Sequence, residues 1–136
     1  MDAANVLADL TEISSQVEAA VVLGEDGTIA ASTVGDGEHA ETIAQAARDL
    51  LSAGEELGSG GRTLVQLEVS LREGSLFVVR AHDRCIAATT TPRPTSGLVF
   101  YDLRTSLRAL AQAEEKPASK PKPKPRRRTK KAAADA

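Results

Sequence analysis

Residues 18–33 read Glu-Ala-Ala-Val-Val-Leu-Gly-Glu-Asp-Gly-Thr-Ile-Ala-Ala-Ser-Thr, and this segment predicts a β-hairpin. Residues 18–23 carry apolar side chains for both faces of a strand, which is typical of a central strand that is covered on both sides. Asp26-Gly27 is a turn pair that tolerates positive φ, and residues 28–33 then form the returning strand. The hairpin therefore places its first strand inside a sheet that is covered on both faces.

Helical periodicity lies on both sides of this hairpin. Over residues 2–16 apolar side chains recur at helical spacing, at Val6, Leu10 and Ile13, and Val17 continues this spacing just after the range. The chain breaks at residues 35–37, and a second helix is expected over residues 38–57, ended by the glycine-rich residues 58–61. The apolar face of this second helix consists of Ala40, Ile43, Ala44, Ala47, Leu50, Leu51 and Gly54.

Three more strands and a last helix complete the order. Residues 63–71 alternate between apolar and polar side chains, and further strands are expected over residues 76–81 and 85–90. Thr95 or Ser96 can cap the final helix. Its apolar face consists of Val99, Leu103, Leu107 and Leu110. The order αββαβββα predicts the α/β (α+β) class, with a five-stranded, mainly antiparallel sheet between helices in three layers.

The charges divide the chain into two parts. Residues 1–113 hold 8 Arg, no Lys and 16 acids, a net of 8 − 16 = −8, whereas residues 114–136 hold 9 cations and 3 acids, a net of 9 − 3 = +6. The second part has little apolar mass to bury, and its alternating Lys-Pro pairs favour an extended chain. We therefore expect one domain over residues 1–113 and a disordered basic tail over residues 114–136.

Three roles for the tail stay open. It could bind nucleic acid or an anionic membrane surface weakly and nonspecifically, dock on an acidic protein face, or only solubilise the chain. It has no aromatic residue to stack on bases, so sequence-specific reading is not expected. The candidate polyanion-binding residues are Lys120, Lys122, Lys124, Arg126, Arg127, Arg128, Lys130 and Lys131.

The sequence predicts neither a catalytic nor a metal site. Residues 58–61 lack the Gly-Lys-Ser/Thr ending of a phosphate loop and precede a strand. Cys85 and His82 flank the turn at residues 83–84, where a small buried thiol beside an exposed histidine is favoured over a reactive pair. Two histidines and one cysteine without metal-ligand spacing do not form a zinc site. We expect no enzyme activity, no cofactor and no metal.

Composition also bears on location. The single cysteine fits a reducing compartment, and neither a signal peptide nor a run of about 20 apolar residues is present. We expect a cytoplasmic protein, and the abundance of Ala and Arg suits a bacterial genome.

Two stretches resemble the Roadblock (dynein-light-chain-type) family. They are residues 21–32, Val-Val-Leu-Gly-Glu-Asp-Gly-Thr-Ile-Ala-Ala-Ser, and residues 75–80, Ser-Leu-Phe-Val-Val-Arg. With the element order and the Ala-rich second helix, the resemblance covers about residues 3–112. It implies a profilin- or longin-like sandwich, and homodimers whose second helices lie antiparallel while their third strands pair across the two-fold axis. It also implies that prokaryotic members are partners and regulators of small Ras-like GTPases, and it carries over surfaces but no catalytic residue.

The residues themselves favour the same dimer. Residues 63–71 could lie at a sheet edge, and they have no proline or lysine and little charge, so an exposed edge there is a hazard unless it is paired or covered. Small side chains on the second helix permit close helix approach, and the alternative is that this stripe packs flat on its own sheet. The expected dimer interface consists of Ala40, Ile43, Ala44, Ala47, Leu51, Leu64, Gln66 and Glu68.

The hypothesis for function is a non-enzymatic regulator or scaffold of a small Ras-like GTPase, acting as a homodimeric platform. Its GTPase-facing residues are expected on the polar face of the second helix, at Glu41, Gln45, Arg48, Ser52 and Glu55. Charge reversal at Arg48 is expected to weaken that contact and to leave the dimer intact. The alternative function is a small nucleic-acid- or membrane-associated protein that binds through its basic tail.

Overall fold

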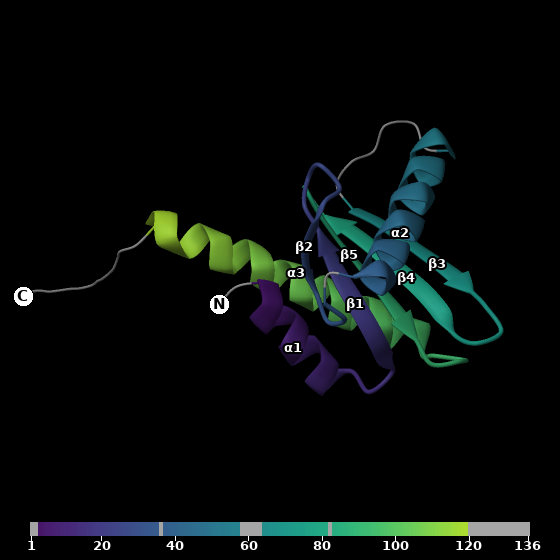
Figure 1. The fold of residues 1–136 in the computed structure, drawn as a ribbon. Coiled ribbons are helices and arrows are strands. Elements are labelled where there is room, and N and C mark those ends of the chain that lie inside the picture. The colour runs from purple at the N-terminus through teal and green to yellow at the C-terminus, as the bar shows by residue number, and fades with distance from the viewer. Residues whose placement is uncertain (1–2, 36, 58–63, 82, 120–136) are drawn as a thin grey trace, which may run out of the picture.

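Figure 1 shows the fold as a computed structural model, which describes residues 3–35, 37–57, 64–81 and 83–119. The elements are α1 (Ala3–Ile13), β1 (Val17–Leu23), β2 (Ile29–Ser32), α2 (Glu38–Leu57), β3 (Leu64–Ser70), β4 (Ser75–Ala81), β5 (Arg84–Thr90) and α3 (Ser96–Ser119). The predicted order αββαβββα is confirmed. It could be predicted from the sequence because hydrophobic periodicity is a property of neighbouring residues.

The five strands form one sheet in the order β2-β1-β5-β4-β3, and every neighbouring pair is antiparallel. β1 lies inside the sheet, and β2 and β3 lie at its two edges. The predicted edge position of residues 63–71 is therefore confirmed. The pairing of β1 with β2 is irregular between Val22 and Leu23, which shortens the ladder at the β2 edge.

Helices cover both faces of the sheet, as Figure 1 shows. α1 and α3 pack on one face and α2 packs on the other. β1 serves both layers, because Val22 is buried on the α1 and α3 side while Val21 is buried on the α2 side. On the first of these sides, the ring of Phe77 meets that of Phe100 from α3 edge to face, with centroids 4.9 Å apart. This alternation is the reason that β1 reads as apolar on both faces.

The β1–β2 hairpin turns at the predicted dipeptide. Gly27 has a φ of 86°, which a residue without Cβ adopts at little cost. The Asp26 carboxylate accepts hydrogen bonds from the Thr28 hydroxyl at 2.7 Å and from the Thr28 backbone N–H at 3.1 Å. These bonds lower the pKa of Asp26 and hold the turn closed.

α3 continues to Ser119, so residues 114–119, which the sequence assigned to the tail, are helical here. Residues 120–136 lie outside the described residues, and the division into domain and tail stays a prediction. Across the part of the chain that is described, no helix has both the length and the apolar character that crossing a membrane requires.

Candidate functional site

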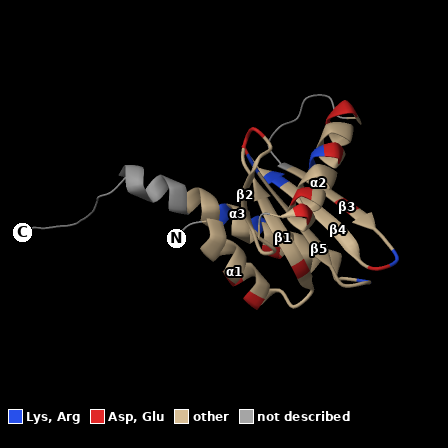
Figure 2. Ribbon diagram, in the orientation of Figure 1, with Lys and Arg blue, Asp and Glu red and all other residues tan. Residues whose placement is uncertain are grey.

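The predicted GTPase-facing residues lie along one side of α2. Glu41, Gln45, Ser52 and Glu55 are exposed, whereas Arg48 is half-buried. In Figure 2, acidic residues mark both α2 and α1. The outer surface of α2 is thus polar and rich in carboxylates, as the helical period predicted.

Arg48 is engaged inside the protein. Its guanidinium donates a hydrogen bond to the Gly27 carbonyl oxygen at 2.5 Å and another to Gln45 Oε1 at 3.0 Å, and it forms an ion pair with Glu41. Its aliphatic part also covers the turn, since a Cβ placed on Gly27 would lie 3.3 Å from Arg48 Cδ. Arg48 therefore fastens α2 to the β1–β2 hairpin, and reversing its charge would disturb this link as well as any partner contact.

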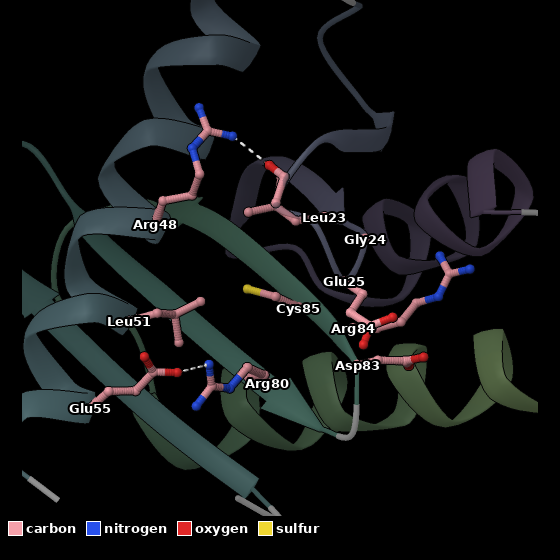
Figure 3. A pocket seen from close by; sticks show the side chains of 11 residues that line it. Leu23, Gly24, Glu25, Arg48, Leu51, Glu55, Arg80, Asp83, Arg84 and Cys85 are labelled. Atoms are coloured by element: carbon pink, nitrogen blue, oxygen red, sulfur yellow. Dashed lines mark hydrogen bonds and ion pairs between the residues drawn. The ribbon is translucent and has the colours of Figure 1, made fainter.

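Glu55 makes a second link between α2 and the sheet. It forms an ion pair with Arg80 of β4, which is drawn as a dashed line in Figure 3. Together the two arginines hold α2 at two points, one at the middle of the helix and one near its carboxyl end. The side chain of Ser52 lies between these links and is exposed.

A cleft of about 470 Å³ opens between these two links (Figure 3). Its charged lining balances, with three arginines and three carboxylates, so the cleft does not favour a simple anion or cation. The charged residues are Arg48, Arg80, Arg84, Glu25, Glu55 and Asp83.

Cys85 also lines this cleft and is buried. Burial raises the pKa of its thiol to about 12, against a smaller opposing effect of Arg80. At neutral pH the thiolate that a nucleophile needs is not formed. His82, the partner considered in the sequence, lies outside the described residues. Within those residues, no cluster of three or more His, Cys, Asp or Glu side chains could hold a metal ion.

Four of the predicted dimer residues are buried within the chain's own core. Ala40, Ala44 and Ala47 have no exposed surface, and Ile43 is 4 % exposed, because all four pack on the sheet. These four side chains therefore pack on the chain's own sheet, which is the alternative to dimer contact given in the sequence analysis. Leu51 is half-buried against the same cluster.

The open apolar side of α2 lies next to these buried residues and faces the β3 edge. Arg48 points to the hairpin at the β2 end of the sheet, so the opposite side of α2 is turned toward β3. Gly54 lies over Leu67 of β3, which is 3.8 Å from a Cβ placed on the glycine. The uncovered side chains are half-buried Ala46 and Leu50, exposed Ala53, and Leu57, which is 91 % exposed. The sequence analysis placed Leu50 on the apolar face of the helix but did not single out Ala46, Ala53 or Leu57, because their exposure depends on which strand lies beneath them.

The β3 edge continues this surface. Val65, Leu67 and Val69 are half-buried on the α2 side, while the side chains of Gln66 and Glu68 point toward α3. Glu68 accepts a hydrogen bond from the Ser96 hydroxyl at 2.8 Å, and Gln66 accepts one from Arg104.

The remaining predicted residues cannot be placed. The side chain of Leu64 lies outside what the structure describes, as do the tail residues from Lys120 to Lys131. Their roles stay predictions.

Comparison with known proteins matches these features to one family. The family model of the Roadblock/LC7 domain matches residues 4–91, which include α1, α2 and all five strands. Among curated proteins, none matches the chain in sequence.

Solved structures share the fold at low sequence identity. A Roadblock/LC7 domain from Streptomyces avermitilis is 22 % identical, with a TM-score of 0.72 over 85 % of this chain and 100 % of that one. MglB of Myxococcus xanthus is 13 % identical, with a TM-score of 0.64 over 83 % and 94 %. A chain of the complex between LokiProfilin2 and rabbit actin is 16 % identical, with a TM-score of 0.57 over 79 % and 94 %, so the profilin-like layering is confirmed.

Proposed function

Since this chain belongs to the Roadblock/LC7 family, we propose that it is a non-enzymatic, homodimeric platform for a small Ras-like GTPase. The observation that carries the proposal is the surface of α2, which has a polar outer face beside an uncovered apolar side and an open strand edge. Such a combination suits a protein that binds a second copy of its own chain through the apolar side of α2 and a different protein through the polar outer face of the same helix.

The homodimer uses the apolar side of α2 and the edge of β3. An unpaired edge strand with half-buried Val65, Leu67 and Val69 offers both backbone hydrogen bonds and apolar area to a second copy. Pairing of two β3 strands across a two-fold axis satisfies those bonds symmetrically. Gln66 and Glu68 lie on the α3 side of this edge.

The GTPase binds to the polar outer face of α2 in this proposal. Two such faces lie side by side in the dimer and present exposed Glu41, Gln45, Ser52 and Glu55 twice. Arg48 contributes by holding the helix in place. Because carboxylates dominate the face, its partner has a basic or hydrogen-bond-donating surface, and charge complementarity raises the association rate.

Capture and binding measurements test this proposal. Immobilised full-length protein is exposed to nuclease-treated lysate of the source cells, once with a non-hydrolysable GTP analogue and once with GDP. We expect one small GTPase to be retained preferentially in one nucleotide state, since a platform that senses the switch must bind the two states unequally. The purified pair is then measured for affinity, nucleotide exchange and GTP hydrolysis.

A matched pair of variants tests whether the GTPase binds at the polar outer face of α2. Ser52→Arg changes an exposed residue at the centre of the α2 face, and Thr105→Arg makes the same change on the exposed side of α3. We expect Ser52→Arg to weaken GTPase binding by at least tenfold and Thr105→Arg to leave it unchanged. Equal affinity for both variants would move the GTPase away from α2, and retention of no GTPase in either state would contradict the function itself.

The charge of the tail supports a second candidate function. Residues 120–136 hold eight cations and one acid, enough for nonspecific binding to nucleic acid or to an anionic membrane. In that case a dimer would supply two tails and raise avidity. This candidate requires binding that ignores the nucleotide state of any GTPase and disappears with moderate salt.

A further inference from the structure

A second cavity lies at the opposite end of the sheet from the charged cleft, beside the amino end of α2. Its volume is about 300 Å³, and the apolar part of its lining includes Val34, Leu71 and Leu76. His39, two carboxylates and three hydroxyl side chains complete the lining, at Glu18, Glu73, Ser75, Thr89 and Thr90. Leu71 is 60 % exposed although it lines the cavity. The apolar part of this lining, with exposed Leu71, is suited to an apolar side chain from outside.

α2 carries such a side chain at its other end. Leu57 is 91 % exposed, and it lies on the same line of the helix as His39, about five turns and about 27 Å away. One helix thus has an unburied leucine at its carboxyl end and a partly apolar cavity at its amino end, both on the side that faces the β3 edge.

The residues between these two ends follow a coiled-coil spacing. From residue 46 to residue 57, apolar or small side chains recur at intervals of four, three and four, which is the period of a seam between two helices. His39 lies one heptad before this run. The seam consists of exposed or half-buried His39, Ala46, Leu50, Ala53 and Leu57, whereas Ile43, at the same spacing, is packed on the chain's own sheet.

The seam is symmetric about residue 48. When two copies run antiparallel with the two-fold axis at that point, His39 of one copy faces Leu57 of the other. Ala46 of one copy then faces Leu50 of the other, a small residue against a large one, while Ala53 lies opposite the turn of α2 that holds buried Ile43. A parallel arrangement would instead place alanine against alanine and leave space unfilled, so close packing favours the antiparallel one.

From this geometry we propose that the cavity beside His39 is a socket for Leu57 of a second copy of the chain. The inference rests on the homodimer of the proposed function, and it adds the register and the anchor residue. Each protomer inserts one leucine and receives one, so both cavities are filled only in the dimer.

Disulfide trapping in the full-length chain tests the register. His39→Cys and Leu57→Cys both change exposed residues, and buried Cys85 with its raised thiol pKa does not compete. We expect a mixed disulfide when the two variants are combined and none when either is used alone, because like positions lie about 27 Å apart and a disulfide needs Cα atoms within about 7 Å.

Measurements of the dissociation constant of the dimer test the role of Leu57 as the anchor residue. We expect Leu57→Ala to raise the dissociation constant of the dimer by about tenfold or more, since a buried leucine is lost at two symmetric places. The matched control is Leu98→Ala, a half-exposed leucine on α3, which should change the constant by less than about twofold. Sedimentation of full-length protein over a dilution series measures both.

The possible outcomes distinguish failure of the socket proposal from failure of the homodimer proposal. A dimer that sediments normally but forms disulfides only between like positions, or none at all, would overturn the socket and leave the proposed function standing. Equal dimer affinity for Leu57→Ala and Leu98→Ala would also overturn it. A full-length chain that is monomeric at every concentration would overturn both the socket and the homodimeric platform.

Discussion

At Gly74 the turn between β3 and β4 passes close to the end of β5. A Cβ placed on this glycine would lie 2.0 Å from the carbonyl oxygen of Thr90, and the φ of 157° is one that other residues rarely adopt. The obstacle is backbone rather than a flexible side chain, so the strands themselves would have to move. The turn therefore requires glycine at position 74, because a Cβ there would overlap the backbone of Thr90.

We predict that Gly74→Ala lowers the free energy of unfolding by at least about 1–3 kcal/mol, the usual cost of forcing atoms into packed structure. The matched control is Gly97→Ala, where nothing lies within 4 Å of the added Cβ and the residue is already helical. That change should raise stability by about 0.5–1 kcal/mol. Denaturant unfolding measures both, and equal effects would mean that the turn relaxes freely.

Cys85 gives the fold a dependence on alkaline pH. Its folded pKa, about 12, lies above the ordinary value of 9.0, because burial disfavours the thiolate. The unfolded chain therefore loses its thiol proton first as pH rises, and that favours unfolding. The contribution of the buried thiol is complete below about pH 9 and decreases between about pH 9 and 12.

We predict that stability decreases above pH 9 with a contribution of up to about 1.4 kcal/mol per pH unit from this thiol. Cys85→Ala should remove that contribution from the slope while leaving other titrating groups in place. Urea unfolding at pH 8, 9 and 10 compares the two proteins. Parallel pH profiles for the two would show that Cys85 is not the source of the slope.

Among the elements, β2 is a short edge strand whose hairpin is held by a contact from another layer. It is four residues long, lies at a sheet edge and pairs only with β1. Arg48 reaches from α2 to the hairpin that leads into it. The hydrogen bond to the Gly27 carbonyl thus stabilises a strand that has few partners of its own.

We predict that Arg48→Met increases amide hydrogen exchange in β2 and leaves exchange in β5 unchanged, because local opening follows the loss of local contacts. Overall stability should decrease by about 1–2 kcal/mol, the range for a charge-assisted hydrogen bond that is partly exposed. Arg108→Met, on the exposed side of α3, provides the control. If β2 exchanges at the same rate in both variants, Arg48 does not hold the hairpin.

The same elements show what sequence could predict. The bounds of α2 and the strand positions follow from periodicity and turn residues, which are local properties. The open side of α2 does not, because it depends on which strand ends the sheet. Ala47 and Ala53 look alike in a helical pattern, yet one is buried on the sheet and the other is exposed beside β3. The links from Arg48 to Gly27 and from Glu55 to Arg80 likewise join segments far apart in the chain.

At the scale of the whole molecule, an acidic domain is joined to a basic carboxyl-terminal segment. Most acids of the described domain lie on α1 and α2 and in the turns between strands (Figure 2), while residues 120–136 hold eight cations and one acid. Phosphate-rich partners are therefore attracted by one end of the chain and repelled by the other.

We predict that full-length protein binds nonspecific duplex DNA weakly, with a logarithmic salt slope no steeper than about −7 for each bound tail, the limit for eight phosphate contacts. Replacing Arg126, Arg127 and Arg128 with glutamine should reduce that slope by about 2–3, because three contacts are lost. GTPase affinity should stay the same in this variant. A large loss of GTPase binding would instead assign the tail to the platform. Fluorescence anisotropy over a salt series measures the slope.

The irregular pairing of β2 has a consequence for how far such chains can assemble. When two β3 strands join, β2 becomes the outer strand at both ends of the continuous sheet. It offers only four residues, and its ladder to β1 is offset between Val22 and Leu23, so it is a poor template for another strand. In the proposed dimer the two edges of the sheet are therefore unequal: β3 pairs with a second copy and β2 ends the sheet, which would limit the assembly to a closed pair rather than a fibre.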